Sequence, residues 1–313
     1  MNEAALKARL KFIAQEKLKT FNEVWKQLLL ERFLARLSGS TYREQFIFKG
    51  GLLLAQYMDL GRETTDIDFS MTKMKSEFSV IQHALCEIVS VDIDDSFRFE
   101  WDTMQILSQP HMEYSGFRAT LQAYFANMKD KIHIDIGVGD MVIPTPKDYR
   151  PFEYNGKPLF VGEITMLVYP VESIFSEKLE TIISKGPNNS RMKDYHDVML
   201  MIKEPGLLNP VALAEKLQAT FKHRNTKFTI PIKFDDTEMI QLQNLWGNHL
   251  RGLGDVRKRL DLPDEISALL AEVNSWLTNL QKTSDAMKEA VGGQLKSFKT
   301  AQALMDDFNN END

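Results

Sequence analysis

Two aspartates separated by a single residue, Asp66 and Asp68, are the first side chains in this sequence that suggest chemistry. They lie in the segment TTDIDFSM, residues 64–71, a short distance after the glycine pair Gly50-Gly51. In an extended strand, alternate side chains point to the same face, so both carboxylates would share one face of this segment. A D-x-D motif and a glycine pair also occur as a solvated strand end and an ordinary turn, and each alone is a weak signal.

A third aspartate, Asp135, has the same alternating pattern in KIHIDIG, residues 131–137, where three isoleucines would face a core. If the two strands are neighbours, three carboxylates converge on one face of a sheet, and they repel each other unless a cation lies between them. Clustered carboxylate oxygens suit Mg²⁺ or Mn²⁺, and two such ions activate an attacking oxygen and stabilise a leaving pyrophosphate. Gly50 and Gly51 would let backbone N–H groups approach phosphate oxygens. The pattern therefore predicts a triphosphate-binding metal site.

Two segments of helical periodicity carry further charged residues. In VESIFSEKLETIISK, residues 171–185, Lys178 lies on or beside an apolar stripe, where it either extends to solvent or meets an anion such as a triphosphate. In RMKDYHDVM, residues 191–199, Asp194 and Asp197 share one helix face with Arg191. These three form either a local salt-bridge cluster or the wall of a cleft that supplies an acid or base. His196 is interpreted as a partly buried or surface histidine and not as a ligand.

The elements that must position these residues form an α+β fold with a mixed sheet, flanking helices and a mostly helical C-terminal lobe. Predicted strands cover residues 45–51, 65–71, 97–107, 116–125 and 131–140, and predicted helices cover residues 4–38, 52–58, 79–90, 171–186 and 191–203. Residues 207–304 are predicted to be mostly helical, and residues 306–313 to form a frayed acidic tail. We expect two domains, residues 1–165 and 166–313.

Composition narrows the functional class. The 313 residues carry a net charge of −6, so a nucleic-acid partner would have to meet a local basic patch, such as residues 1–51 or 249–260. The alternative for both segments is a solvent-exposed helix face that binds no partner. Cys86 is the sole cysteine, which excludes an intrachain disulfide, and no window has the apolar length of a membrane span or the apolar core of a signal peptide. We therefore expect a cytoplasmic protein without membrane partners.

Five segments in this order resemble the AbiEii/AbiGii-type nucleotidyltransferase toxins of the DNA polymerase β-like superfamily. They are residues 31–51, 64–71, 131–137, 171–186 and 191–200, and the resemblance extends over about residues 25–205. It implies a bilobed enzyme that acts as the toxin of a type IV toxin–antitoxin or abortive-infection pair. Some relatives transfer a nucleotide from an NTP to the 3′ end of tRNA and so block translation. The resemblance also implies a cognate antitoxin of winged-helix type.

The resemblance assigns roles by position. Asp66, Asp68 and Asp135 match the metal-binding acids, and Lys178 matches a nucleotide-contacting lysine. Either Asp194 or Asp197 matches the last acidic motif. The predicted nucleotide-binding set is Lys49, Gly50, Gly51, Thr65, Lys178 and Arg191. One departure is the Gly-Gly turn, where the wider superfamily has Gly-Ser and a shorter gap to the D-x-D motif.

Three functional interpretations stay open. The first is metal-dependent transfer of a nucleoside monophosphate to an RNA acceptor, with Mg²⁺ or Mn²⁺ as cofactor. The second keeps the chemistry but modifies a protein hydroxyl, including a serine of the enzyme itself. The third is a non-catalytic module that binds a nucleotide or a partner protein.

Overall fold

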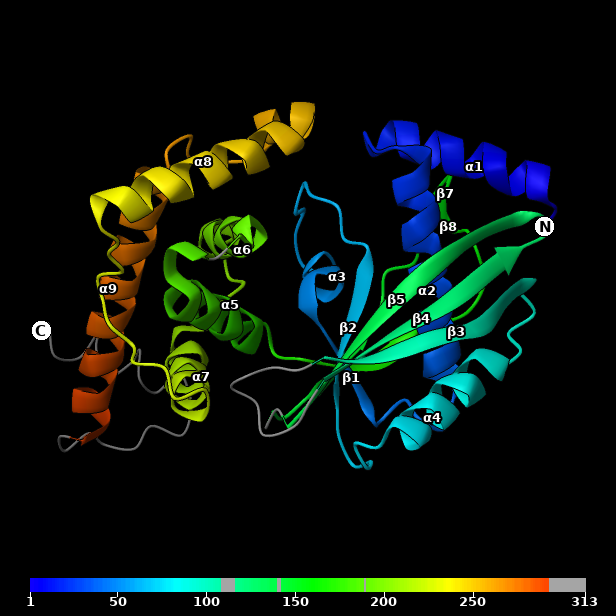
Figure 1. Ribbon diagram of the computed structural model, residues 1–313, viewed down its shortest axis with the longest axis horizontal. Helices are drawn as coiled ribbons and strands as arrows, with labels where there is room; N and C mark the ends of the chain where they lie inside the picture. Colours follow the sequence, from blue (N-terminus) through cyan, green and yellow to red (C-terminus); the bar gives the residue numbers. More distant parts are fainter. Residues whose placement is uncertain (108–115, 140–141, 189, 293–313) are drawn as a thin grey trace, which may run out of the picture.

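The computed structural model describes residues 1–107, 116–139, 142–188 and 190–292. One half of the molecule is built around a mixed sheet, and the other consists of helices (Figure 1). This arrangement confirms the predicted α+β class with a mostly helical C-terminal lobe. The predicted tail at residues 306–313 lies outside the described residues.

The sheet has seven strands in the order β3-β4-β5-β2-β1-β9-β6, and a separate two-stranded hairpin is formed by β7 and β8. Their bounds are β1 (Phe46–Lys49), β2 (Asp66–Met71), β3 (Phe97–Leu107), β4 (Gly116–Phe125), β5 (Met128–Val138), β6 (Thr145–Asp148), β7 (Glu153–Tyr154), β8 (Lys157–Pro158) and β9 (Thr165–Val168). β2 lies in the middle, parallel to β5 and antiparallel to β1. All five predicted strands are present, whereas β6 to β9 were not predicted.

Two helices cover the apolar face of this sheet: α2 (Phe21–Gly39) packs against β5, and α4 (Phe78–Ser90) packs against β3. α1 (Glu3–Glu16) packs on α2, and the short α3 (Gly50–Leu54) follows β1 and contacts β2. The core between α2 and the sheet is aromatic: the ring of Phe33 on α2 lies 6.3 Å from Phe69 and 6.4 Å from Phe99. Burial of Ile67 and Phe69 on this face leaves Asp66 and Asp68 on the opposite face.

The helical structure predicted over residues 4–38 is confirmed, but it is divided into α1 and α2, because the chain breaks between them. Leu18 adopts a left-handed conformation with φ 52°. Thr20 then begins α2 with a capping box, in which its hydroxyl accepts from the Glu23 N–H while the Glu23 carboxylate accepts from the Thr20 N–H. The helix predicted over residues 52–58 is also displaced, since α3 begins at Gly50 and ends at Leu54.

The helical lobe begins directly after β9 and has its own core. It contains α5 (Val171–Lys185), the 3₁₀ segment η1 (Gly186–Asn188), α6 (Met192–Lys203), α7 (Pro210–His223), α8 (Asp236–Gly252), the 3₁₀ segment η2 (Gly254–Arg259) and α9 (Ile266–Gly292). Its core includes Trp246 and Tyr195, and also Leu54 and Leu60, which come from the first half of the chain. β9 belongs to the sheet, and the division at residues 165 and 166 stays a prediction.

Among the helices described, none combines the length and apolar character needed to cross a bilayer.

Candidate active site

The three predicted acids lie together on the polar face of the sheet. β2 and β5 are parallel neighbours whose register pairs Asp68 with Asp135 and Asp66 with His133. These carboxylates form one wall of a cavity of about 670 Å³, and residues of α5 and α6 form the facing wall. The cavity therefore lies between the sheet and the helical lobe.

Gly50 is required where the chain turns from β1 into α3. Its φ of +77° is a left-handed conformation that favours glycine. A Cβ at this position would lie 2.0 Å from Oδ2 of Asp68, so any side chain would displace the carboxylate. A Cβ on Gly51 would lie 3.0 Å from a guanidinium nitrogen of Arg62. The glycine pair thus lets the backbone approach the acids closely. Its predicted contact with a triphosphate stays a prediction.

The carboxylate of Asp68 carries an electrostatic cost. Burial raises its pKa, the neighbouring charge of Asp135 raises it further, and Lys49 and Lys178 lower it in part. A cation bound here would remove this repulsion, so the chemistry of the donor set fits a hard divalent ion.

Arg118, which was not predicted as a site residue, forms a salt bridge with Asp135. Arg118 on β4 lies opposite Asp135 in the antiparallel register and donates two hydrogen bonds to its carboxylate, each 2.6 Å long. The same guanidinium lies 4.0 Å from Asp66. In this arrangement no three acidic, histidine or cysteine side chains of the described ranges are placed to hold a metal ion together. A cation and Arg118 would therefore compete for Asp135.

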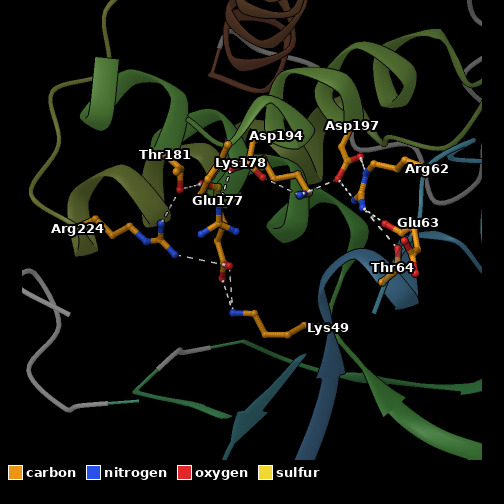
Figure 2. A network of polar contacts seen from close by, with 11 residues as sticks. Lys49, Arg62, Glu63, Thr64, Glu177, Lys178, Thr181, Asp194, Asp197 and Arg224 are labelled. Carbon is orange, nitrogen blue, oxygen red and sulfur yellow. Dashed lines mark hydrogen bonds and ion pairs between the residues drawn. The ribbon is translucent and has the colours of Figure 1, made fainter. Parts of the chain in front are cut away.

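Lys178 on α5 meets anions rather than extending to solvent. Its ammonium lies 2.9 Å from Asp194 and 2.8 Å from Asp197, both buried on α6 (Figure 2). Arg191 is exposed and lies 3.3 Å from Asp194, as its helical spacing indicates. The sequence left a salt-bridge cluster and a cleft wall as alternatives for these residues. Both are present, because Lys178, Asp194 and Arg191 form ion pairs and also line the cavity. Their roles in catalysis or nucleotide binding stay predictions.

Arg62 is the second basic residue that the sequence analysis missed. It lies in the loop between α3 and β2 and donates two hydrogen bonds of 2.6 Å to Asp197. Its position shortly before the D-x-D motif was the available signal, but its partner is 135 residues away in the sequence, beyond the reach of local patterns.

Two further predicted residues lie on the cavity wall, Lys49 and Thr65. The Lys49 ammonium lies 3.0 Å from Glu177 on α5, and Glu177 also lies 3.5 Å from Arg224 on α7 (Figure 2). Thr65 donates a hydrogen bond to Asp66. Lys49 thus links β1 to the helical lobe, and a role in nucleotide binding stays a prediction for both residues.

His196 was interpreted as a partly buried or surface histidine, and the structure buries it completely. Its ring nitrogens contact the Leu60 carbonyl oxygen at 2.7 Å and His249 Nε2 at 2.9 Å. It therefore ties α6 to the loop before β2 and to α8.

A comparison with curated proteins gives no match to this chain. The solved structure of JHP933 from Helicobacter pylori is similar to it with a TM-score of 0.50 and 13% identity, over 87% of this chain and 97% of that one. A second H. pylori structure, provisionally named a nucleotidyltransferase, has a TM-score of 0.47 and 14% identity, over 86% and 98%.

At this level of identity the JHP933 similarity concerns the fold alone. A family model described as "Nucleotidyl transferase AbiEii toxin, Type IV TA system" matches residues 32–272, a range that includes the Gly50-Gly51 pair and the cavity aspartates Asp66, Asp68, Asp135 and Asp194. This chain belongs to the AbiEii family of nucleotidyltransferase toxins from type IV toxin–antitoxin systems.

Proposed function

We propose that this enzyme transfers a nucleoside monophosphate from an NTP to the 3′ end of tRNA, with Mg²⁺ or Mn²⁺ as cofactor, and thereby blocks translation. Membership of the family supports the nucleotidyltransferase activity and an antitoxin partner. The observation that carries the finer proposal is the single cavity in which Asp66, Asp68 and Asp135 face Lys178 and Asp194.

Asp66, Asp68 and Asp135 would hold the metal. A bound divalent ion supplies Lewis acidity, which favours the attacking hydroxyl as its alkoxide and stabilises the charge on the leaving pyrophosphate. Asp135 would also accept the proton of the attacking hydroxyl once its carboxylate is released from Arg118. The freed guanidinium, which is partly exposed at the cavity wall, would then be available for phosphate oxygens.

Both walls of the cavity bind the nucleotide in this proposal. The Lys178 ammonium is a point charge suited to phosphate, and the Gly50-Gly51 backbone approaches closely enough for N–H groups to contact phosphate oxygens. Lys49, Thr65 and Arg191 line the same cavity and would add further contacts.

A basic rim supports a polyanionic acceptor. Lys185, Arg191 and Lys193 line the cavity from its helical side, and all three are exposed. They provide the local positive charge that an acidic protein needs to bind RNA. By contrast, the excess of basic residues in segment 1–51 is partly internal, because Arg32 and Arg36 are buried beside Glu31 and Asp95.

We further propose that the antitoxin is a winged-helix protein encoded beside this gene and that the pair acts in the cytoplasm. A small upstream open reading frame with a helix–turn–helix pattern is the expected observation.

The test is a labelling reaction with purified protein, each radiolabelled NTP, Mg²⁺ and total tRNA. We expect label at the 3′ end of tRNA, and we expect Asp66→Asn and Asp68→Asn to lower the rate at least about 100-fold, since each removes a metal ligand. Asp102→Asn is the matched control, because Asp102 is a carboxylate on β3 of the same sheet, lies outside the cavity and pairs with Lys131.

Each alternative has its own outcome. Label on a protein hydroxyl and not on RNA would refute the tRNA acceptor and leave nucleotidyl transfer intact. NTP binding that needs no divalent ion and persists in Asp66→Asn, without any transfer, would instead identify a binding module.

A further inference from the structure

Five charged side chains form a chain of alternating sign between the two halves of the molecule. The order is Arg62, Asp197, Lys178, Asp194 and Arg191, with successive contacts of 2.6, 2.8, 2.9 and 3.3 Å. It begins in the loop before β2 and ends at the cavity rim, and its first four members are seen in Figure 2. The chain thus joins the segment that carries the D-x-D motif to the helices that carry the lysine.

The two aspartates of this chain have different surroundings. The Asp197 side chain is 0% exposed, does not line the cavity, and has both oxygens engaged by Arg62. Asp194 does line the cavity, and its Oδ2 accepts no hydrogen bond from the described residues, although Arg191 lies beside it. Asp194 therefore borders the cavity with its Oδ2 buried beside Arg191, whereas Asp197 is absent from the cavity lining and bonds to Arg62 through both oxygens.

Arg62 bonds both to α6 of the helical lobe and to the segment that precedes β2 of the sheet. Besides Asp197, it donates to the Glu63 carbonyl oxygen at 3.2 Å and to the Thr64 hydroxyl at 3.4 Å, in the segment that leads into Asp66. Its side chain is 7% exposed, so these bonds are made away from bulk water, where a planar guanidinium holds a carboxylate in one orientation.

We propose that Arg62 and Asp197 are positioning residues that hold the Lys178 ammonium at the cavity, and that Asp194 is the one of the two aspartates that faces the substrate. This inference rests on the proposed nucleotidyl transfer, with Lys178 as a phosphate ligand. Removing Arg62 would leave Asp197 Oδ1 buried without its donor. The Asp197 carboxylate would then turn toward Lys178 and draw the ammonium away from the triphosphate.

A double-mutant cycle tests this coupling. The variants are Arg62→Met, Lys178→Met and the double variant, and kcat, KM for the NTP and Tm are measured for each. We expect Lys178→Met to lower kcat/KM about 100-fold. Arg62→Met should lower it about tenfold, mainly through KM, as for other residues that orient a ligand-binding group. In the Lys178→Met background, the Arg62 substitution should cause no further loss.

Controls separate positioning from stability. Arg43→Met removes an exposed arginine outside the cavity and should leave both constants unchanged. If Arg62→Met does not fold, Arg62→Lys keeps the charge without the paired hydrogen bonds, and we expect an intermediate rise in KM. A full-sized Arg62 effect in the Lys178→Met background, or no effect in the wild-type background, would overturn the inference.

The two aspartates complete the test. Asp194→Asn should still lower kcat in the Lys178→Met background, whereas Asp197→Asn should add nothing there; the reverse result would overturn the assignment. Failure of the proposed function looks different: Lys178→Met itself would then match the wild type in NTP binding and transfer.

Discussion

The ionised side chain of Asp68 destabilises the folded protein, although it is one of the predicted metal ligands. Its carboxylate is enclosed between the Gly50 turn and Asp135, and burial together with the Asp135 charge raises its pKa. A carboxyl group whose pKa is higher in the folded state than in the unfolded state disfavours folding at pH values where it is ionised. Asp68 of the D-x-D motif, which suggests metal binding, is therefore also a source of electrostatic repulsion with Asp135 in the folded protein.

Replacing Asp68 by asparagine should stabilise the protein without divalent ions. Asparagine resembles the neutral acid in shape, so at pH 7 the variant avoids the cost of ionisation, and we expect its free energy of unfolding to exceed that of the wild type. The advantage should shrink as the pH falls through the raised pKa of Asp68, because the wild-type side chain then becomes neutral. Urea unfolding in EDTA at pH 7 and at pH 4.5 measures both effects.

The exposed Asp102→Asn substitution is the control and should change stability by less than about 0.5 kcal/mol. Adding Mg²⁺ should stabilise the wild type and not Asp68→Asn. Equal or lower stability of Asp68→Asn in EDTA would show that the carboxylate is already compensated.

Alternation of apolar and polar residues in the sequence was sufficient to predict those strands that bury one face. β3 and β4 have the predicted bounds, and β2 and β5 carry their acids and isoleucines on opposite faces as predicted. The short strands β6 to β9 have no such signal, because two to four residues do not establish a period. Arg62 and Arg118 were missed for another reason: their importance comes from partners on other elements, which only the folded topology brings near.

The His196–His249 pair shows a similar long-range connection between elements. The Leu60 carbonyl only accepts hydrogen bonds, so His196 Nε2 carries the proton and His196 Nδ1 accepts from His249 Nε2. Burial lowers the pKa of His196 to about 4, and burial also lowers the pKa of His249. The folded structure therefore favours the neutral form of both imidazole rings.

Acid should weaken this connection. The unfolded chain protonates His196 near its ordinary pKa of 6.5 and the folded chain only near 4, so the folded state binds fewer protons between these values. Stability should fall as the pH decreases from about 6.5 toward 4, by roughly 2 to 3 kcal/mol from this residue.

His196→Gln should flatten that dependence while lowering stability at pH 7.5, because an amide donates to Leu60 but does not titrate. Urea unfolding between pH 7.5 and 5 measures the slope. His83→Gln, at an exposed position on α4, should leave the slope unchanged. An unchanged slope in His196→Gln would contradict the assigned tautomer and its burial cost.

For the molecule as a whole, the two cores are joined by the segment between α3 and β2. Leu54 and Leu60 lie in the helical core, and a Cβ on Gly61 would lie 2.5 Å from Leu260, so this segment packs tightly into the helical lobe. Arg62 continues the connection through Asp197. The chain also passes without a linker from β9 into α5. Both walls of the cavity are therefore fixed to one another by apolar packing as well as by charge.

This packing predicts that the two halves unfold together. Trp25 reports on the sheet core and Trp246 on the helical core, since both are buried in their own clusters. We compare two variants that each retain one of these tryptophans and have the other three replaced by phenylalanine. In each variant, the urea unfolding curve followed by the remaining tryptophan should coincide with the curve followed by far-UV circular dichroism. Leu60→Ala, which removes a side chain buried in the helical core, should lower both midpoints equally and cost about 2 to 5 kcal/mol. Two separated transitions would instead show that residues 1–165 and 166–313 are autonomous domains, with a cavity whose walls move independently.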